Sequence, residues 1–173
     1  MRGLKYQVVY ISLSGNTERL AKELYGILPK ESTRLVNLCE DDADTRADVY
    51  LIGFGYNQGR IPLMIIELLE QLSGKTVLLF ATCGLLPTEE YRDAIAKKLF
   101  PFLPDDCDWR GLYLCGGAFP NEVAENLEQL RERGEENKQV QMFLEAKRET
   151  DGHPDERDVE EALAFVRKAL YDN

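Results

Sequence analysis

The apolar positions along the chain alternate between two periodicities, and this alternation predicts short strands separated by helices. Residues 6–11 form a nearly continuous β-prone run, which is typical of a strand buried on both faces of a parallel sheet. Similar runs predict four more strands, at residues 33–38, 49–54, 76–82 and 111–115. Strands that alternate with helices indicate βαβ units, so we expect one α/β domain over residues 1–173.

Helical spacing of apolar residues predicts the connections between these strands. Four helices are expected. The first follows the first loop and ends at Pro29, and the second covers residues 62–72. The third begins at 87–89 and reaches Leu99, and Asp155 caps the last. Tyr91 is expected to face the core of its helix. A further helical pattern at about 122–151, interrupted at Gly134, predicts an acidic helical excursion between the fifth strand and the last helix.

Charge is unevenly distributed along this pattern. The chain has 31 acidic and 21 basic residues, a formal net charge of −10, and −8 of it falls within residues 122–161. This balance argues against nucleic acid and anionic membranes as partners, because both are bound by Lys and Arg. The acidic stretch is either a solvated helical surface or a surface that docks basic redox partner proteins.

The cysteines and the single histidine do not form a metal-binding pattern. Cys39, Cys83, Cys107 and Cys115 are widely spaced, and His153 is interpreted as a turn residue. Cys83 is more simply a small buried hydrophobe than a redox thiol. No apolar stretch reaches the roughly 18 residues of a membrane span, and the first residues do not resemble a signal peptide. We therefore expect a cytoplasmic, monomeric protein with free thiols and no metal.

The most informative segment is the loop after the first predicted strand. It comprises Ser12, Leu13, Ser14, Gly15, Asn16 and Thr17. Ligands bind at this edge of open α/β sheets, and a helix N-terminus offers unpaired N–H groups to a phosphate. The loop contains no Lys or Arg, so neutral donors alone would hold an anion. The alternative interpretation is an ordinary turn with a helix cap, because turns use the same residues.

This loop resembles the first loop of the flavodoxin family, Thr/Ser-x-Thr/Ser-Gly-Asn-Thr, which wraps the phosphate of FMN. Segments 53–59 and 80–84 are similar to the second and third flavin loops in position and composition. The resemblance implies a doubly wound, flavodoxin-like five-stranded parallel sheet of order 2-1-3-4-5, with helices on both faces, and FMN as cofactor. It implies as cofactor-binding residues Ser12, Leu13, Ser14, Gly15, Asn16, Thr17, Gly55, Tyr56, Asn57, Gln58, Gly59, Thr82, Cys83 and Gly84.

The chain departs from this family in the third loop. Electron-carrier flavodoxins place aromatic rings on both faces of the flavin, whereas the third loop here offers only Cys83, Gly84, Leu85 and Leu86. Tyr56 in the second loop is poorly explained by core packing, so it is a candidate for flavin contact. The other ring face would then be covered by an aliphatic side chain or left open to a partner or substrate.

Three functions are compatible with these residues. The first is an FMN-binding electron-transfer protein with no catalytic residue of its own, because the flavin carries the chemistry. The second is an FMN-dependent reductase of a small conjugated acceptor such as a quinone, or an accessory subunit to such a reductase. The third is a flavin-free α/β interaction domain. A dinucleotide fingerprint is disfavoured, because the glycines at 53–59 follow the third strand and have the wrong spacing.

Overall fold

The computed structural model describes residues 3–135 and 137–172, and it places five strands in one parallel sheet. The strands are β1 (Tyr6–Tyr10), β2 (Thr33–Asn37), β3 (Val49–Tyr56), β4 (Thr76–Cys83) and β5 (Asp108–Gly116). Their order is β2-β1-β3-β4-β5. The predicted fold class and strand order are confirmed. The order reverses between β1 and β3, so the loops that leave these strands diverge there and open a crevice where ligands bind in such sheets.

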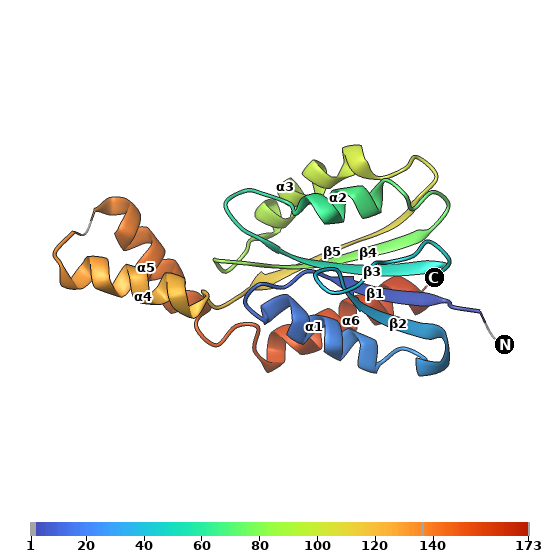
Figure 1. Ribbon diagram of the computed structural model, residues 1–173, viewed down its shortest axis with the longest axis horizontal. Coiled ribbons are helices and arrows are strands. Elements are labelled where there is room, and N and C mark those ends of the chain that lie inside the picture. Colours follow the sequence, from blue (N-terminus) through green and yellow to red (C-terminus); the bar gives the residue numbers. More distant parts are fainter. Residues whose placement is uncertain (1–2, 136, 173) are drawn as a thin grey trace.

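Four helices cover the two faces of this sheet (Figure 1). Helices α1 (Asn16–Gly26) and α6 (Glu156–Tyr171) lie on one face, and α2 (Leu63–Leu69) and α3 (Glu89–Leu99) lie on the other. Short 3-10 turns, η1 (Lys30–Ser32) and η2 (Phe100–Phe102), precede β2 and follow α3. Each face has its own core of buried apolar side chains, because both faces of a parallel sheet are shielded from water. Among the described helices, none has the length and apolar character that a membrane span requires.

The remaining two helices form a hairpin that projects beyond the carboxyl edge of the sheet (Figure 1). They are α4 (Asn121–Glu132) and α5 (Lys138–Thr150), and they pack against each other around Leu127 and Val140. Thr150 is fully buried at the base of the hairpin, where its hydroxyl donates to the Ala146 carbonyl over 2.9 Å. The segment after β5 is therefore a pair of helices next to the predicted ligand loops.

Several predicted boundaries are wrong. Strand β3 continues to Tyr56, because its last residues pair with β4 up to Cys83. Strand β5 begins at Asp108 and so includes Trp109, whose ring packs edge-on against Phe100 at 5.9 Å. Helix α2 is also shorter than expected. For the two strands, pairing with β4 extends the element beyond what local periodicity indicates.

Asp44 ties the connection between β2 and β3 to the sheet. Its carboxylate accepts hydrogen bonds from Arg46 over 2.8 Å and from the buried Gln7 side chain over 2.8 Å. The Tyr50 hydroxyl donates to the Asp44 carbonyl over 2.6 Å. The Arg46 hydrogen bond is the largest cause that lowers the pKa of Asp44 from its usual 3.8. The ionised form is therefore the one that the fold stabilises.

We expect this carboxylate to contribute to stability at neutral pH and to lose that contribution in acid. Because its folded pKa is depressed, the contribution is complete above the ordinary pKa of 3.8 and disappears as the pH falls through the folded value. Asp44→Asn should therefore unfold more easily at pH 7 but approach the wild type as the pH falls below 3.8 and through the lowered pKa of Asp44. Urea unfolding at several pH values measures this difference, with exposed Asp42→Asn as the control. An Asp44→Asn deficit that stays constant across this range would contradict the expectation.

Candidate functional site

The first loop makes a tight turn between β1 and α1. The Ser12 hydroxyl accepts a hydrogen bond from the Gly15 N–H over 3.1 Å. Gly15 has φ +87°, a left-handed conformation that side chains other than glycine rarely adopt. No atom lies within 4 Å of the position where its Cβ would be, so the space above this turn is open.

The turn leaves a set of hydrogen-bond donors facing that space. Within residues 3–135 and 137–172, the N–H groups of Asn16, Thr17 and Glu18 have no protein acceptor. They begin α1, where the helix carries a partial positive charge. Ser14 is exposed beside them and adds a hydroxyl. The loop therefore has the donors of an anion site built without cationic side chains.

The acidic residue in the first turn of α1 is turned away from these donors. The carboxylate of Glu18 binds the Lys22 ammonium over 3.1 Å and the Tyr10 hydroxyl over 3.1 Å. The hydrogen bond from Lys22 is the largest cause that lowers the pKa of Glu18. A charge that is paired in this way repels a nearby anion less than a free carboxylate does.

Two side chains of the first loop are used inside the protein instead of being offered to a ligand. The Asn16 amide donates to the carbonyl of Ala118 over 2.8 Å. The hydroxyl of Thr17 is buried and bonds the Thr82 hydroxyl over 3.0 Å. These side chains therefore tie the loop to distant segments, and their part in binding a phosphate stays a prediction. Their backbone N–H groups remain available.

The second loop is an exposed turn that leaves the end of β3. Asn57, Gln58 and Gly59 are exposed, and the Arg60 N–H closes the turn on the Asn57 carbonyl over 3.0 Å. Gln58 has φ +53° and Gly59 has φ +71°. The Ile11 N–H donates to the Gly53 carbonyl over 3.0 Å, so the first and second loops leave adjacent strands at one edge.

Tyr56 does not lie in this turn. It is the last residue of β3, only 4 % of it is exposed, and its ring packs edge-on against Tyr91 at 6.1 Å. Its hydroxyl accepts a hydrogen bond from the Lys98 ammonium over 2.7 Å. The view that core packing explains Tyr56 poorly is wrong, because the longer β3 carries it under α3. The expectation that Tyr91 faces the core is confirmed, and a flavin contact of Tyr56 stays a prediction.

The third loop begins with two buried residues, Thr82 and Cys83. Burial is the main cause that raises the pKa of the Cys83 thiol to about 11, so the thiolate is disfavoured at neutral pH. Cys115 on the adjacent strand is also buried, and burial raises the pKa of its thiol strongly. The interpretation of Cys83 as a small buried hydrophobe is confirmed. Gly84 follows at the surface and is half-buried.

A fourth segment, which sequence reasoning missed, lies at this edge. We call residues 117–119, between β5 and α4, the strap. The Gly117 N–H donates to the Cys83 carbonyl over 2.8 Å, and the Ala118 carbonyl accepts the Asn16 amide. A Cβ on Gly117 would lie 2.7 Å from the Asn16 amide nitrogen, so only glycine allows this approach. The paired glycines after the fifth strand are the signal that could have identified the strap.

The turn before α6 also meets the strap. The Ala118 N–H donates to the His153 carbonyl over 2.8 Å, and Arg19 on α1 donates to the Pro154 carbonyl. His153 lies within reach of Asp155 and Asp158, a group whose ligand atoms are all within 4.8 Å. Both carboxylates are already used, because they form the capping box of α6. The interpretations of His153 as a turn residue and Asp155 as a cap are confirmed.

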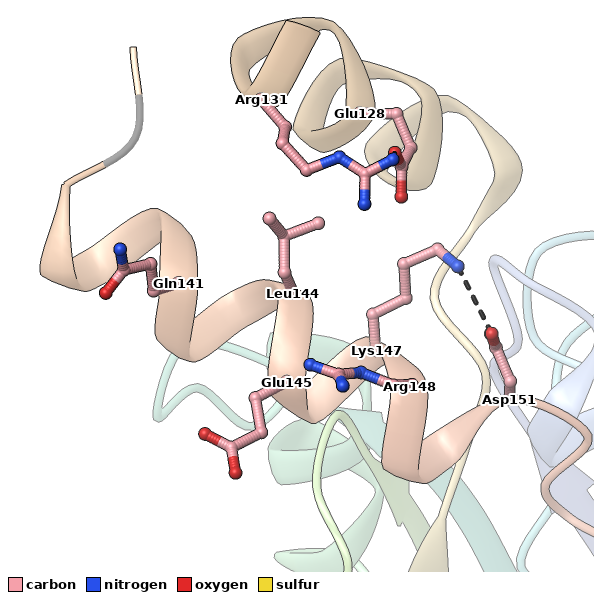
Figure 2. Close-up of a pocket in the computed structure, with 8 residues that line it drawn as sticks. All are labelled: Glu128, Arg131, Gln141, Leu144, Glu145, Lys147, Arg148 and Asp151. Carbon is pink, nitrogen blue, oxygen red and sulfur yellow. Dashed lines mark hydrogen bonds and ion pairs between the residues drawn. The ribbon is translucent and has the colours of Figure 1, made fainter. Parts of the chain in front are cut away.

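A cleft of about 580 Å³ lies between the two helices of the hairpin. Figure 2 shows the side chains that line it. Two of the three cations that line it are paired with carboxylates: Arg131 with Glu128 at 2.6 Å, and Lys147 with Asp151 at 3.2 Å. Leu144 points between the helices. None of the lining residues belongs to the three predicted flavin loops. The charge balance gives this cleft no preference for an anion, so it is a feature of the hairpin and not of the candidate cofactor site.

A second cleft, of about 420 Å³, lies beside the third loop. The lining residues come from that loop, from β5 and from the start of α6: Leu86, Pro87, Leu114, Cys115, Gly116, His153, Asp155, Arg157, Asp158 and Glu161. It is apolar on the strand side and rich in carboxylates on the helix side. A cleft therefore lies directly next to the candidate site.

Comparison with known proteins agrees with this geometry. The flavodoxin domain family matches residues 7–167. A flavodoxin-like domain-containing protein, BilS, from Clostridioides difficile (strain CD3) is 24 % identical, and the match covers 96 % of this chain and 97 % of that protein. A protein of the same description from Clostridium symbiosum (strain WAL-14163) is 25 % identical, with 90 % of each chain covered.

Solved structures show the same fold. A short-chain flavodoxin associated with a non-canonical PDU bacterial microcompartment superposes with a TM-score of 0.59 at 15 % identity, covering 96 % of this chain and 97 % of the other. Oxidised flavodoxin 1 from Bacillus cereus superposes with a TM-score of 0.57 at 15 % identity, covering 98 % and 99 %. The fold and its open loop edge define a flavodoxin-like α/β protein. The family match over most of the length shows that the chain belongs to the flavodoxin domain family.

Proposed function

We propose that this protein binds FMN at the carboxyl edge of its sheet and transfers electrons between partner redox proteins. The observation that carries the proposal is the open turn at Gly15, with its unpaired N–H groups at the point where the strand order reverses. Membership of the flavodoxin family supports a flavin at this place. Its four free cysteines support a reducing, cytoplasmic location.

Each loop would have a separate task. The N–H groups at the start of α1, with the hydroxyls of Ser12 and Ser14, would hold the phosphate. Residues 55–59 and 82–84 would flank the ring, as the family resemblance implies. Bound flavin would supply the capacity for one- and two-electron transfer. The chain itself contributes binding, orientation and local charge.

Titration of the apoprotein with flavins tests this function. Binding at these loops should quench or shift the fluorescence of FMN. The titration should saturate at one FMN per protein chain. Riboflavin should bind at least about tenfold more weakly, because it lacks the phosphate and hydrogen bonds to charged groups contribute about 1.5 to 3 kcal/mol. Absence of FMN binding at about 10 μM would overturn the proposal and favour the flavin-free interaction domain.

The acidic surface supports a partner with a basic docking face. The hairpin, residues 121–150, has eight acidic and five basic residues, whereas residues 151–161 have six acidic residues and only Arg157 as a base. The charge therefore concentrates in the turn before α6 and in the first turns of that helix. This segment contacts the strap through His153, so the acidity lies next to the candidate flavin edge. Opposite charge on a partner would raise the rate of productive encounter.

We expect neutralisation of this segment to slow electron transfer to a basic partner. Glu156→Gln with Glu160→Gln should lower the second-order rate of reduction of a basic c-type cytochrome severalfold in dilute buffer. The difference should shrink between about 0.01 and 0.1 M salt, because the Debye length falls from about 30 to about 10 Å. The control, Glu31→Gln with Asp105→Asn, makes the same charge change on residues remote from the loops. Equal slowing by both pairs would indicate a net-charge effect and contradict a local docking surface.

The cleft beside the third loop favours a second candidate function. Its volume of about 420 Å³ is enough for a small conjugated acceptor next to the flavin loops. On this alternative the protein is an FMN-dependent reductase, or an accessory subunit that serves one. Turnover of a nicotinamide donor with a quinone and no added protein would favour the stand-alone reductase over the electron carrier.

A further inference from the structure

The third loop offers no aromatic side chain of its own to a ligand. Thr82 and Cys83 are buried, and Leu85 is an aliphatic residue packed against the core. The nearest later aromatic, Tyr91, packs against Tyr56 under α3. A flat conjugated ring at this loop would therefore meet backbone and aliphatic groups, unless another segment supplied an aromatic.

The strap brings such a residue to the loop. Its backbone is held on the β4 side by the Gly117 N–H, which donates to the Cys83 carbonyl over 2.8 Å. It is held on the α1 side by the Asn16 amide, which donates to the Ala118 carbonyl over 2.8 Å. The Ala118 N–H binds the His153 carbonyl over 2.8 Å. These three hydrogen bonds fix the backbone immediately before Phe119.

The ring of Phe119 lies on Gly84 of the third loop. Three of its carbon atoms are 3.2, 3.7 and 3.9 Å from the position that a Cβ on Gly84 would take. The absence of a side chain at Gly84 therefore makes the contact possible. Phe119 is half-buried, and its strap joins the first and third loops at this edge. An aromatic that only filled the core would be expected on a strand or under a helix, as Tyr56 and Phe80 are.

We propose that Phe119 covers one face of the flavin ring and takes the place of the aromatic that the third loop lacks. The proposal rests on the proposed function, because it requires a flavin at these loops. Aromatic rings attract one another in offset or edge-to-face arrangements beyond the gain from burial alone. Phe119 would act on the ring of the flavin and not on its phosphate, so it would contribute equally to binding of FMN and of riboflavin.

Binding of both flavins to Phe119 variants tests this role. Phe119→Leu keeps an apolar side chain and should weaken FMN and riboflavin binding by the same factor, about five- to tenfold. Phe119→Tyr should restore binding to within about twofold, because it keeps the ring. The visible circular dichroism of the bound flavin should change in the leucine variant, since this signal reports on the surroundings of the ring. Phe143→Leu, at an exposed position of α5, is the matched control and should change none of these values.

A second variant tests the contact with Gly84 directly. Gly84→Ala places a methyl group 3.2 Å from the Phe119 ring and should displace it. Gly84→Ala alone should therefore weaken riboflavin binding relative to the wild type. Added to Phe119→Leu, it should weaken binding little further, because the leucine variant has already lost the contact between the ring and Gly84.

The possible results separate the two proposals. If the wild type binds no flavin, the proposed function fails. If it binds FMN and riboflavin and the Phe119→Leu protein binds both within twofold of it, the role of Phe119 alone is overturned. A loss shared by the leucine and tyrosine variants, with a lower melting temperature in both, would also overturn it, because that result indicates packing of the strap.

Discussion

Ser14→Asp is expected to remove most of the affinity for FMN without weakening the fold. Ser14 is exposed beside the unpaired N–H groups of Asn16 and Thr17, where we place the phosphate. A carboxylate there would bind the same donors and repel the phosphate dianion. Lost hydrogen bonds to a charged group contribute about 1.5 to 3 kcal/mol, so with the added repulsion the dissociation constant should rise roughly a hundredfold or more.

The stability of this variant provides the internal control. A negative charge at the start of a helix is favourable by about 0.3 to 1 kcal/mol, so the melting temperature of Ser14→Asp should be unchanged or slightly higher. Riboflavin binding should change by less than about threefold, because riboflavin has no phosphate to be repelled. Ser14→Ala, which removes one donor without adding charge, should cost about tenfold for FMN. A Ser14→Asp protein that binds FMN as well as the wild type would show that the phosphate lies elsewhere.

Gly53→Ala is expected to cause a large loss of stability, although it adds only one methyl group. Gly53 is buried in the middle of β3, beside Tyr10 of β1 and Phe80 of β4. A Cβ at this position would lie 2.2 Å from the Phe80 ring, far inside the roughly 3.5 to 4.0 Å of a normal carbon–carbon contact. Phe80 is itself only 1 % exposed, so its ring has little room to move.

Overpacking of this kind costs typically 1 to 3 kcal/mol, and we expect about 3 kcal/mol at Gly53 because the overlap is with a rigid ring. For a chain of this size the melting temperature should fall by roughly 6 to 12 °C. Gly26→Ala is the matched control: nothing lies within 4 Å of its Cβ position near the end of α1, so the change should be neutral or slightly stabilising. The double variant Gly53→Ala with Phe80→Leu should lose less free energy of unfolding than the sum of the losses in the two single variants, because the smaller side chain relieves the overlap. A Gly53→Ala protein as stable as the wild type would contradict this view of the β3–β4 packing.

Much of the fold follows from local patterns in the sequence. The buried run at residues 6–11 and the helical spacing of the last helix require only that apolar side chains share a face, and both elements form where they are expected. The turn at Gly15 follows from its own residues in the same way, because the left-handed conformation suits glycine and Ser12 closes the turn locally. Asp155 caps α6 by a hydrogen bond to Asp158, three residues away.

The surroundings of the loops did not follow from local patterns. Tyr56 is adjacent to glycines and amides in sequence, which suggests a loop, but pairing of β3 with β4 extends the strand and buries the ring. Asn16 and Thr17 have the right side chains for an anion site, yet Ala118 and Thr82, both distant in sequence, occupy them. Pairing across the sheet depends on strand length and order, which no short window of sequence contains.

The sequence by itself therefore determined the strand and helix pattern, the glycine turn at the first loop and the concentration of negative charge between residues 122 and 161. Tertiary structure alone decided that the acidic segment before and within the start of α6 joins the strap at the candidate flavin edge, and that Phe119 lies on Gly84. The physical reason is that turns and amphipathic faces arise from interactions between near neighbours, whereas the neighbours of a loop at a sheet edge are set by the order of the strands.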